Sequence, residues 1–228
     1  MRSAPKGQSG RTRYIVVSPG AADLPLLLVW LERQAADPAF MGFPTVTRIP
    51  AHRVVVRPVE CADLPDLLDV NGDDEVTRFV PYPTWSSLAD GMAWLVRVQG
   101  LAEGGTAQQL VIERKHDRKV IGAVLLFKYE ASSSRLELGY VLGRTHWRQG
   151  LSREALRAVC GHLFGNGSVR RIEAEVNPDN VASCTLLEGL GFTLEGRLRK
   201  RWVANGRTYD VNFYGCLAEE WPRSQAAL

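Results

Sequence analysis

The hydrophobic and polar positions divide the chain into an irregular start and a long stretch of regular periodicity. Residues 1–48 combine a Gly/Ser/Arg-rich beginning, a helix expected over about 22–36, and several interrupting prolines and glycines. From Arg53 onward, β-rich runs alternate with segments of helical period. We therefore expect an N-terminal arm with a short helix over 1–48, one folded domain over 49–222 and a C-terminal tail over 223–228.

The periodic stretch predicts an α/β (α+β) domain with a mixed sheet. One helix carries Leu156, Val159, Leu163 and Phe164 at a spacing that gives a core-facing stripe. Two β-rich runs flank the turn-like residues 115–118, which indicates a hairpin, and a third run completes an antiparallel meander. The expected strands are 54–56, 109–113, 120–127, 135–142, 171–176, 192–202 and 207–217, and the expected helices are 62–70, 87–101, 152–164 and 181–190.

The composition is that of a folded soluble protein. Hydrophobic residues make up 45% and charged residues 23%, and the net charge of +3 is too small and too evenly spread for a nucleic-acid binder. The longest apolar run, 24–31, is far shorter than the ~20 residues of a membrane span and lacks the context of a secretory signal. We expect a cytoplasmic protein with no membrane partner. The same run could cover a neighbouring subunit, which leaves a homodimer open.

The four cysteines, Cys61, Cys160, Cys184 and Cys216, lie far apart in the sequence. None belongs to a C-x-x-C pair, and no histidine lies beside them at ligand spacing. The sequence therefore predicts neither a metal site nor a disulfide framework.

The segment 137–152 carries the clearest candidate chemistry. It reads as a strand, a glycine-containing loop and the start of a helix, where free N–H groups and the helix dipole bind anions. Residues 147–152 could hold a pyrophosphate, although an ordinary turn would look the same. Gly139 inside the strand indicates either a bulge or the close approach of a ligand. A splayed strand would offer its amides to an extended amide-bearing ligand such as the pantetheine arm of coenzyme A.

A second polar segment, Asn177-Pro178-Asp179-Asn180, leaves a later strand. Asn180 can cap the following helix, with Ser183 at its third position. Capping alone would explain Asn180, but it does not forbid a second role facing a ligand.

Several motifs in this order resemble the GCN5-related N-acetyltransferase (GNAT) superfamily, over roughly 53–221. They are Glu137-Leu138-Gly139-Tyr140, Trp147-Arg148-Gln149-Gly150, Glu154-Ala155, Asn180-x-x-Ser183 and Glu188-x-Leu190-Gly191-Phe192. The segments 193–196 and 210–214 resemble the branch that acetylates the N-terminal serine or alanine of ribosomal proteins. The resemblance implies the GNAT fold, with a mostly antiparallel sheet of six to seven strands flanked by about four helices.

The resemblance implies acetyl-coenzyme A as co-substrate and an amine acceptor, either a protein N-terminus or a small amine. The pyrophosphate would lie on the loop and helix start, and the pantetheine along the preceding strand. The implied cofactor-binding residues are Leu138, Tyr140, Val141, Leu142, Arg148, Gln149, Gly150, Leu151, Ser152, Arg153, Asn177, Asn180 and Ser183.

Three residues are candidates for catalysis by direct attack of the amine. Glu137 would take the amine's proton, or it is a strand residue paired with Arg135. Ser183 matches the serine that protonates the departing thiolate in the ribosomal branch, or it serves capping and packing. Tyr214 is a further donor candidate, although a buried tyrosine in the last strand is the commoner explanation.

Some positions depart from the family pattern. Arg148 stands where relatives usually have glycine, and Ser152 where they favour alanine or glycine. The catalytic glutamate of the ribosomal branch aligns with Trp202, which leaves the acceptor open and keeps an acetyl-coenzyme A sensor without turnover as an alternative.

Two surface features have open interpretations. Arg197, Arg199, Lys200 and Arg201 form a basic run, read as a solvated face or as an attractor for an acidic peptide or the cofactor's 3′-phosphate. Trp85 and Trp94 belong either to the acceptor wall or to the core.

Overall fold

The computed structural model describes residues 42–204 and 207–221. All of them belong to one unit of the chain, Pro38–Leu228. The helix expected in the N-terminal arm, the apolar run 24–31 and the tail 223–228 lie outside the described residues. Within the described part, no helix has the length and apolar character needed to cross a bilayer.

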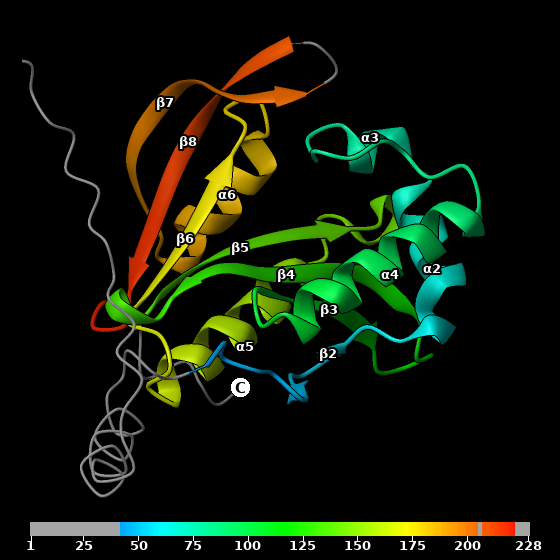
Figure 1. The fold of residues 1–228 in the computed structure, drawn as a ribbon, viewed down its shortest axis with the longest axis horizontal. Coiled ribbons are helices and arrows are strands. Elements are labelled where there is room, and N and C mark those ends of the chain that lie inside the picture. The colour runs from blue at the N-terminus through cyan, green and yellow to red at the C-terminus, as the bar shows by residue number, and fades with distance from the viewer. Residues whose placement is uncertain (1–41, 205–206, 222–228) are drawn as a thin grey trace, which may run out of the picture. The chain divides into compact units, whose positions relative to one another are not determined.

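An eight-stranded mixed sheet, in the order β1-β2-β3-β4-β5-β6-β8-β7, forms the centre of the fold (Figure 1). Every neighbouring pair is antiparallel except β5 and β6, which confirms the mixed, mostly antiparallel sheet. The count exceeds the expected six to seven because a two-residue strand, β1, pairs with β2. The strands are β1 Ile49–Pro50, β2 Val54–Pro58, β3 Ala107–Arg114, β4 Val120–Glu130, β5 Arg135–Leu142, β6 Arg171–Val176, β7 Thr193–Ala204 and β8 Arg207–Leu217.

Five α-helices occur in the described residues, against about four expected. The additional one, α3, is a single turn that the side chain of Asp73 caps by accepting from the Glu75 amide. A capping box formed by Ser87 and Asp90 begins α4. The helices are α2 Leu64–Asn71, α3 Asp74–Thr77, α4 Leu88–Glu103, α5 Leu151–Gly165 and α6 Val181–Leu190, and short 3₁₀ turns occupy Cys61–Asp63, Ala131–Ser133 and Arg144–His146.

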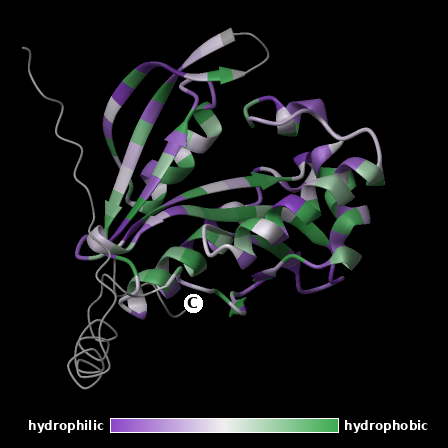
Figure 2. Cartoon of the chain, viewed as in Figure 1, coloured by the Kyte–Doolittle hydropathy of each residue, from purple (hydrophilic) through white to green (hydrophobic). Residues whose placement is uncertain are grey.

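The helices cover the two faces of the sheet. Along β3, Leu110 and Ile112 join the apolar cluster that contains α5 and α6, whereas Val111 between them joins the cluster that contains α2 and α4. This alternation follows from the two-residue period of a strand. Figure 2 shows the central strands as largely hydrophobic and β7 as richer in hydrophilic residues.

Strands β5 and β6 pair only at their beginnings and then diverge (Figure 1). Their register runs from Arg135 opposite Arg171 to Glu137 opposite Glu173 and stops there. On its other side, β5 stays paired with β4 up to Leu142. Within the described part of the chain, residues 138–142 therefore have one edge without a strand partner, and this edge faces the gap between the diverging strands.

Gly139 marks no bulge. The register between β4 and β5 is regular through Gly139, and the irregularity in this pair lies in β4, between Phe127 and Glu130. Among the described residues, a Cβ built on Gly139 would meet only Phe127, at 3.9 Å, and the backbone does not adopt a positive φ. Packing against these residues therefore does not require glycine here, which is consistent with the other interpretation, the close approach of a ligand.

Candidate active site

The start of α5 leaves its first backbone amides without acceptors among the described residues. Gly150 adopts φ 76°, which turns the chain into the helix, and the first helical bond is donated by Glu154 to the Gly150 carbonyl, at 3.0 Å. The amides of Leu151, Ser152 and Arg153 have no acceptor among the described residues. Three unpaired N–H groups at the positive end of a fifteen-residue helix suit a phosphate group.

The loop before α5 is fixed by its own side chains. Trp147 Nε1 donates to the Leu142 carbonyl at 2.7 Å, and Gln149 Nε2 donates to the Thr145 carbonyl at 2.9 Å. Arg148 adopts φ 59°, a left-handed conformation that disfavours a residue with a Cβ by about 1–2 kcal/mol. This conformation gives a physical reason why the resemblance leads us to expect glycine at this position.

An ion pair joins the first turn of α5 to β2. Glu154 accepts from Arg53 Nε at 2.8 Å and from the backbone amides of Arg53 and Val54. Burial opposes ionisation of Glu154, but these hydrogen bonds outweigh it and lower its pKa. The carboxylate therefore stays charged and holds the helix start in place.

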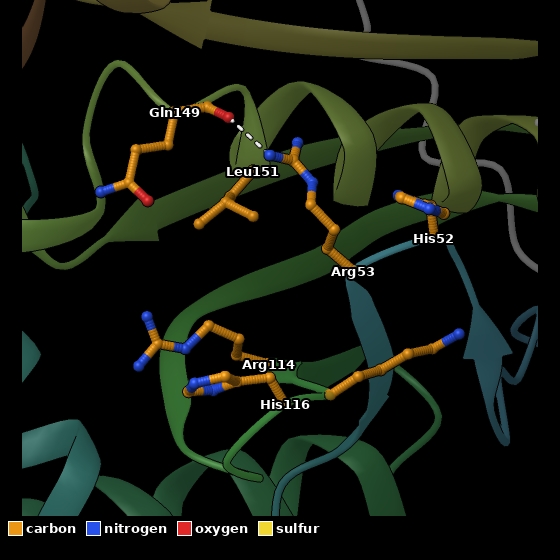
Figure 3. A pocket seen from close by; sticks show the side chains of 7 residues that line it. His52, Arg53, Arg114, His116, Gln149 and Leu151 are labelled. Carbon is orange, nitrogen blue, oxygen red and sulfur yellow. Dashed lines mark hydrogen bonds between the residues drawn. The ribbon is translucent and has the colours of Figure 1, made fainter.

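A basic hollow of about 380 Å³ lies beside this ion pair (Figure 3). Arg53 also donates to the Gln149 carbonyl there, at 3.0 Å, so it fixes the loop before α5 from this side. The hollow is lined by His52, Arg53, Arg114, Lys115, His116, Gln149 and Leu151.

The unpaired edge of β5 leads from the helix start to Glu137. Five residues of strand, 138–142, span about 17 Å. Across the gap, the Tyr140 hydroxyl donates to the Ser183 carbonyl at 3.5 Å, so β5 and the first turn of α6 lie on the two sides of this part of the gap. An extended chain with amide groups can lie along this edge as a peptide adds to a sheet.

The polar residues between β6 and α6 are largely engaged in shaping the turn. Asn180 caps α6 by accepting from the Ser183 amide at 3.2 Å, and buried Asn177 accepts from the Asp179 amide at 2.9 Å. Capping thus accounts for the Asn180 side-chain oxygen. The Ser183 side chain is half-buried.

Three glutamates gather at the closed end of the gap. Glu137 lies opposite Glu173 in the ladder, and Glu175 follows two residues further along β6. Their strand neighbours, including Leu136, Ile172 and Ala174, belong to the α5/α6 cluster, so the three carboxylates lie on the other face of the sheet, that of α2 and α4.

Lys128 connects two of these carboxylates. Its Nζ lies 2.7 Å from Glu137 and 3.6 Å from Glu175. The side chain of Glu137 is 7% exposed and that of Glu175 only 3%, whereas Lys128 is about half exposed. Two largely buried carboxylates therefore share one accessible ammonium group.

The pKa values of Glu137 and Glu175 are shifted in opposite directions. Burial raises the pKa of Glu137, and Lys128 only partly offsets it. Burial has the same tendency at Glu175, but hydrogen bonds from Arg201 and Trp202 outweigh it and lower the pKa of Glu175. Such a separation is typical of acid–base sites and marks Glu137 as the stronger base.

Tyr214 is fully buried in the core. It is 1% exposed, and its hydroxyl donates to Glu188 at 3.0 Å. Burial raises the pKa of Tyr214. The hydroxyl proton of Tyr214 is therefore already used in a hydrogen bond to a residue of α6.

Comparison with known proteins decides the family. The profile of the acetyltransferase (GNAT) domain matches residues 53–193, which is more than half of the chain. The chain belongs to the GNAT acetyltransferase family.

Individual GNAT proteins support this membership. The chain is 31% identical over 169 residues to the uncharacterised N-acetyltransferase p20 of Bacillus licheniformis, covering 74% of the chain and 95% of the relative. It is 32% identical over 120 residues to the ribosomal-protein-serine acetyltransferase of Escherichia coli, covering 51% and 66%. A solved RimL ribosomal L7/L12 α-N-protein acetyltransferase in complex with coenzyme A shares the fold with a TM-score of 0.68 at 22% identity, covering 75% and 97%.

In this GNAT protein, Trp202 and its neighbour Arg201 both donate to the carboxylate of Glu175. Trp202 Nε1 donates to Glu175 at 2.7 Å, and Arg201 adds a second bond at 3.2 Å. The tryptophan thus holds a carboxylate of another strand. The sequence alone did not identify Glu175 and Lys128 as candidate site residues. The alternation of Glu173 and Glu175 with apolar residues could have indicated a shared strand face, but nothing in the local sequence indicates the contacts of Lys128.

The remaining candidates lie at the edges of the site. Trp85 is 7% exposed and belongs to the core cluster of α2 and α4, with its ring 5.3 Å from that of Trp94, so it packs in the core. The basic run on β7 is exposed and borders a hollow of about 750 Å³ lined by Arg197, Leu198, Arg199, Lys200 and Asp210.

Proposed function

We propose that this GNAT protein transfers an acetyl group from acetyl-coenzyme A to a primary amine by direct attack of the amine on the thioester. The observation that carries the proposal is the continuous path from the free amides of α5, along the unpaired edge 138–142, to the buried carboxylate of Glu137. The path joins an anion site, a binding edge for an amide-bearing chain and a base, which are the three features that this reaction needs.

The cofactor's pyrophosphate would bind the amides of residues 151–153, and its pantetheine would bond to the edge 138–142. Arg148 and Arg153 add positive charge beside the phosphates, and the loop carbonyl of Gln149 is already taken by Arg53. Asn177, Asn180 and Ser183 would line the opposite wall. On this arrangement the thioester lies at the closed end of the gap, beside Glu137.

Glu137 would take the proton of the acceptor's ammonium group, directly or through water. Its raised pKa makes it a better base than an ordinary carboxylate. The amine then forms the C–N bond as the C–S bond breaks. Ser183 would protonate the departing thiolate, which suits its half-buried position on the first turn of α6. Tyr214 is the weaker candidate, because its hydroxyl already donates to Glu188.

The acceptor would be a protein N-terminus or a small amine. The Escherichia coli relative that acts on a ribosomal protein supports testing N-terminal serine and alanine peptides. The basic run on β7 would favour a peptide with acidic residues after its N-terminus.

Release of free thiol from acetyl-coenzyme A over a panel of peptides and small amines tests the proposal. Glu137→Gln should lower kcat/KM by about 10²- to 10⁴-fold on any productive acceptor. Glu130→Gln is the matched control, because Glu130 is an exposed carboxylate near the β4–β5 turn whose partner is Arg135. Equal activity of both variants and the wild type would remove Glu137 from the mechanism.

A sensor that binds acetyl-coenzyme A without turnover is the second candidate. It is favoured by the Lys128 ammonium, which already pairs with the proposed base, and by the replacement of the branch's glutamate with Trp202. Saturable binding in calorimetry with no thiol release on any acceptor would support the sensor and overturn the transferase.

A further inference from the structure

Lys128 is held in an uncommon backbone conformation at the proposed active site. It adopts φ 52°, within the irregular pairing between Phe127 and Glu130. A residue with a Cβ is disfavoured in this left-handed region. The surrounding structure thus overcomes a local preference, and the outcome is a lysine amine beside Glu137.

Among the described residues, Lys128 is the only one of four lysines that forms an ion pair. Lys115, Lys119 and Lys200 are exposed on turns and on β7. The 2.7 Å distance from Lys128 Nζ to Glu137 lies within the range for a nucleophile and its general base. The side chain remains about half exposed, so the amine can move without breaking core packing.

The pair lies on the face of β5 where the proposed transfer would bring the acceptor amine. Glu137 projects from the α2/α4 face of β5 at the point where the strands diverge, and Lys128 reaches the same carboxylate. Lys128 Nζ therefore occupies the position that the ammonium group of an external acceptor would take beside the base.

We propose that the protein acetylates its own Lys128, which makes this residue an internal acceptor and a modification site; this rests on the proposed transferase function. Glu137 takes a proton from the Lys128 ammonium group, and the freed lone pair attacks the acetyl carbonyl carbon of acetyl-coenzyme A. The Nζ–C bond forms, the C–S bond breaks, and the departing thiolate takes up the second proton that the nitrogen loses as it becomes an amide. The products are Nζ-acetyl-lysine and free coenzyme A.

Incubation of the full chain with acetyl-coenzyme A, followed by peptide mass mapping over time, tests this proposal. We expect one acetyl group at Lys128, added at least about tenfold faster than at Lys115 or Lys119 and with a rate independent of protein concentration. Glu137→Gln should slow labelling of Lys128 by about 100-fold or more. Lys119→Arg is the matched control and should leave the labelling of Lys128 unchanged.

Two outcomes overturn the inference. Labelling of Lys128 at the rate of the exposed lysines would show ordinary chemical acetylation, and equal rates in wild type and Glu137→Gln would show that the base takes no part. The parallel thiol-release assay separates this failure from that of the function. If external amines turn over while Lys128 stays unmodified, the transferase stands and Lys128 serves only as a counter-ion.

Discussion

Gly139→Ala separates the demands of folding from those of ligand binding at β5. The new methyl group would meet only Phe127, at an ordinary contact distance of 3.9 Å, and φ is not positive. Glycine in a strand is less stable than alanine by roughly 0.5–1 kcal/mol, so the variant should be as stable as the wild type or slightly more stable. We therefore expect the variant to fold normally.

The same methyl group should impair turnover. Residues 137 and 139 share one strand face, so the methyl projects beside the Glu137 carboxylate into the space proposed for the acyl group and the acceptor. Insertion of a methyl group into a fitted site typically costs about 1–3 kcal/mol. We therefore expect kcat/KM to fall by about 5- to 150-fold, measured by thiol release with the best acceptor of the panel.

Two other glycines provide controls. At Gly165, at the end of α5, a new methyl would meet no described residue within 4 Å, so Gly165→Ala should leave activity unchanged and stability unchanged or slightly raised. Gly122→Ala would bring its Cβ to 2.4 Å from the Val141 carbonyl and should strongly destabilise the fold in urea unfolding. If Gly139→Ala folds normally and retains wild-type kcat/KM, no ligand approaches this face of β5 and the proposed site is refuted.

Three further changes test individual groups. Because burial raises the pKa of Glu137 and the base must be ionised, kcat/KM should fall as the pH decreases through a value above the ~4.3 of an ordinary glutamate. If Glu137→Gln shows the same acidic fall in kcat/KM, Glu137 is not the base. Ser183→Ala should lower kcat by about 100-fold or more, whereas Thr185→Ala, exposed on the same helix, should not; equal kcat values would argue against a proton donor at 183. Trp202→Phe removes a hydrogen-bond donor from the nearly buried carboxylate of Glu175 and should lower the free energy of unfolding by about 1–3 kcal/mol in urea titrations. An unchanged urea midpoint would mean that the hydrogen bond from Trp202 to Glu175 contributes little to stability.

Much of the fold could be predicted from local pattern. Strands β5, β6 and β8 and helix α6 begin and end where the periodicity predicts, because each is a clear run bounded by turn residues. The single-turn helix α3 and the two-residue strand β1 are too short to give a periodic signal. The latter becomes a strand only through its pairing with β2.

The part of the site that is formed by backbone amides could be predicted from the sequence. A glycine before an amphipathic helix predicts free amides at its start, and the structure has them at residues 151–153. The contacts of Lys128 with Glu137 and Glu175 were not predictable. They depend on a register irregularity, a left-handed residue and the pairing of distant strands, none of which is encoded in a local period.

If the unpaired edge of β5 and the start of α5 together bind coenzyme A, the ligand must protect the amides of both segments. The decisive experiment is amide hydrogen exchange with and without coenzyme A, measured over residues 138–142 and 151–153. Saturating coenzyme A should slow exchange in both segments, with little change at the exposed β3–β4 turn. Calorimetric binding of coenzyme A with unchanged exchange in both segments, or no binding at all, would refute this placement of the cofactor.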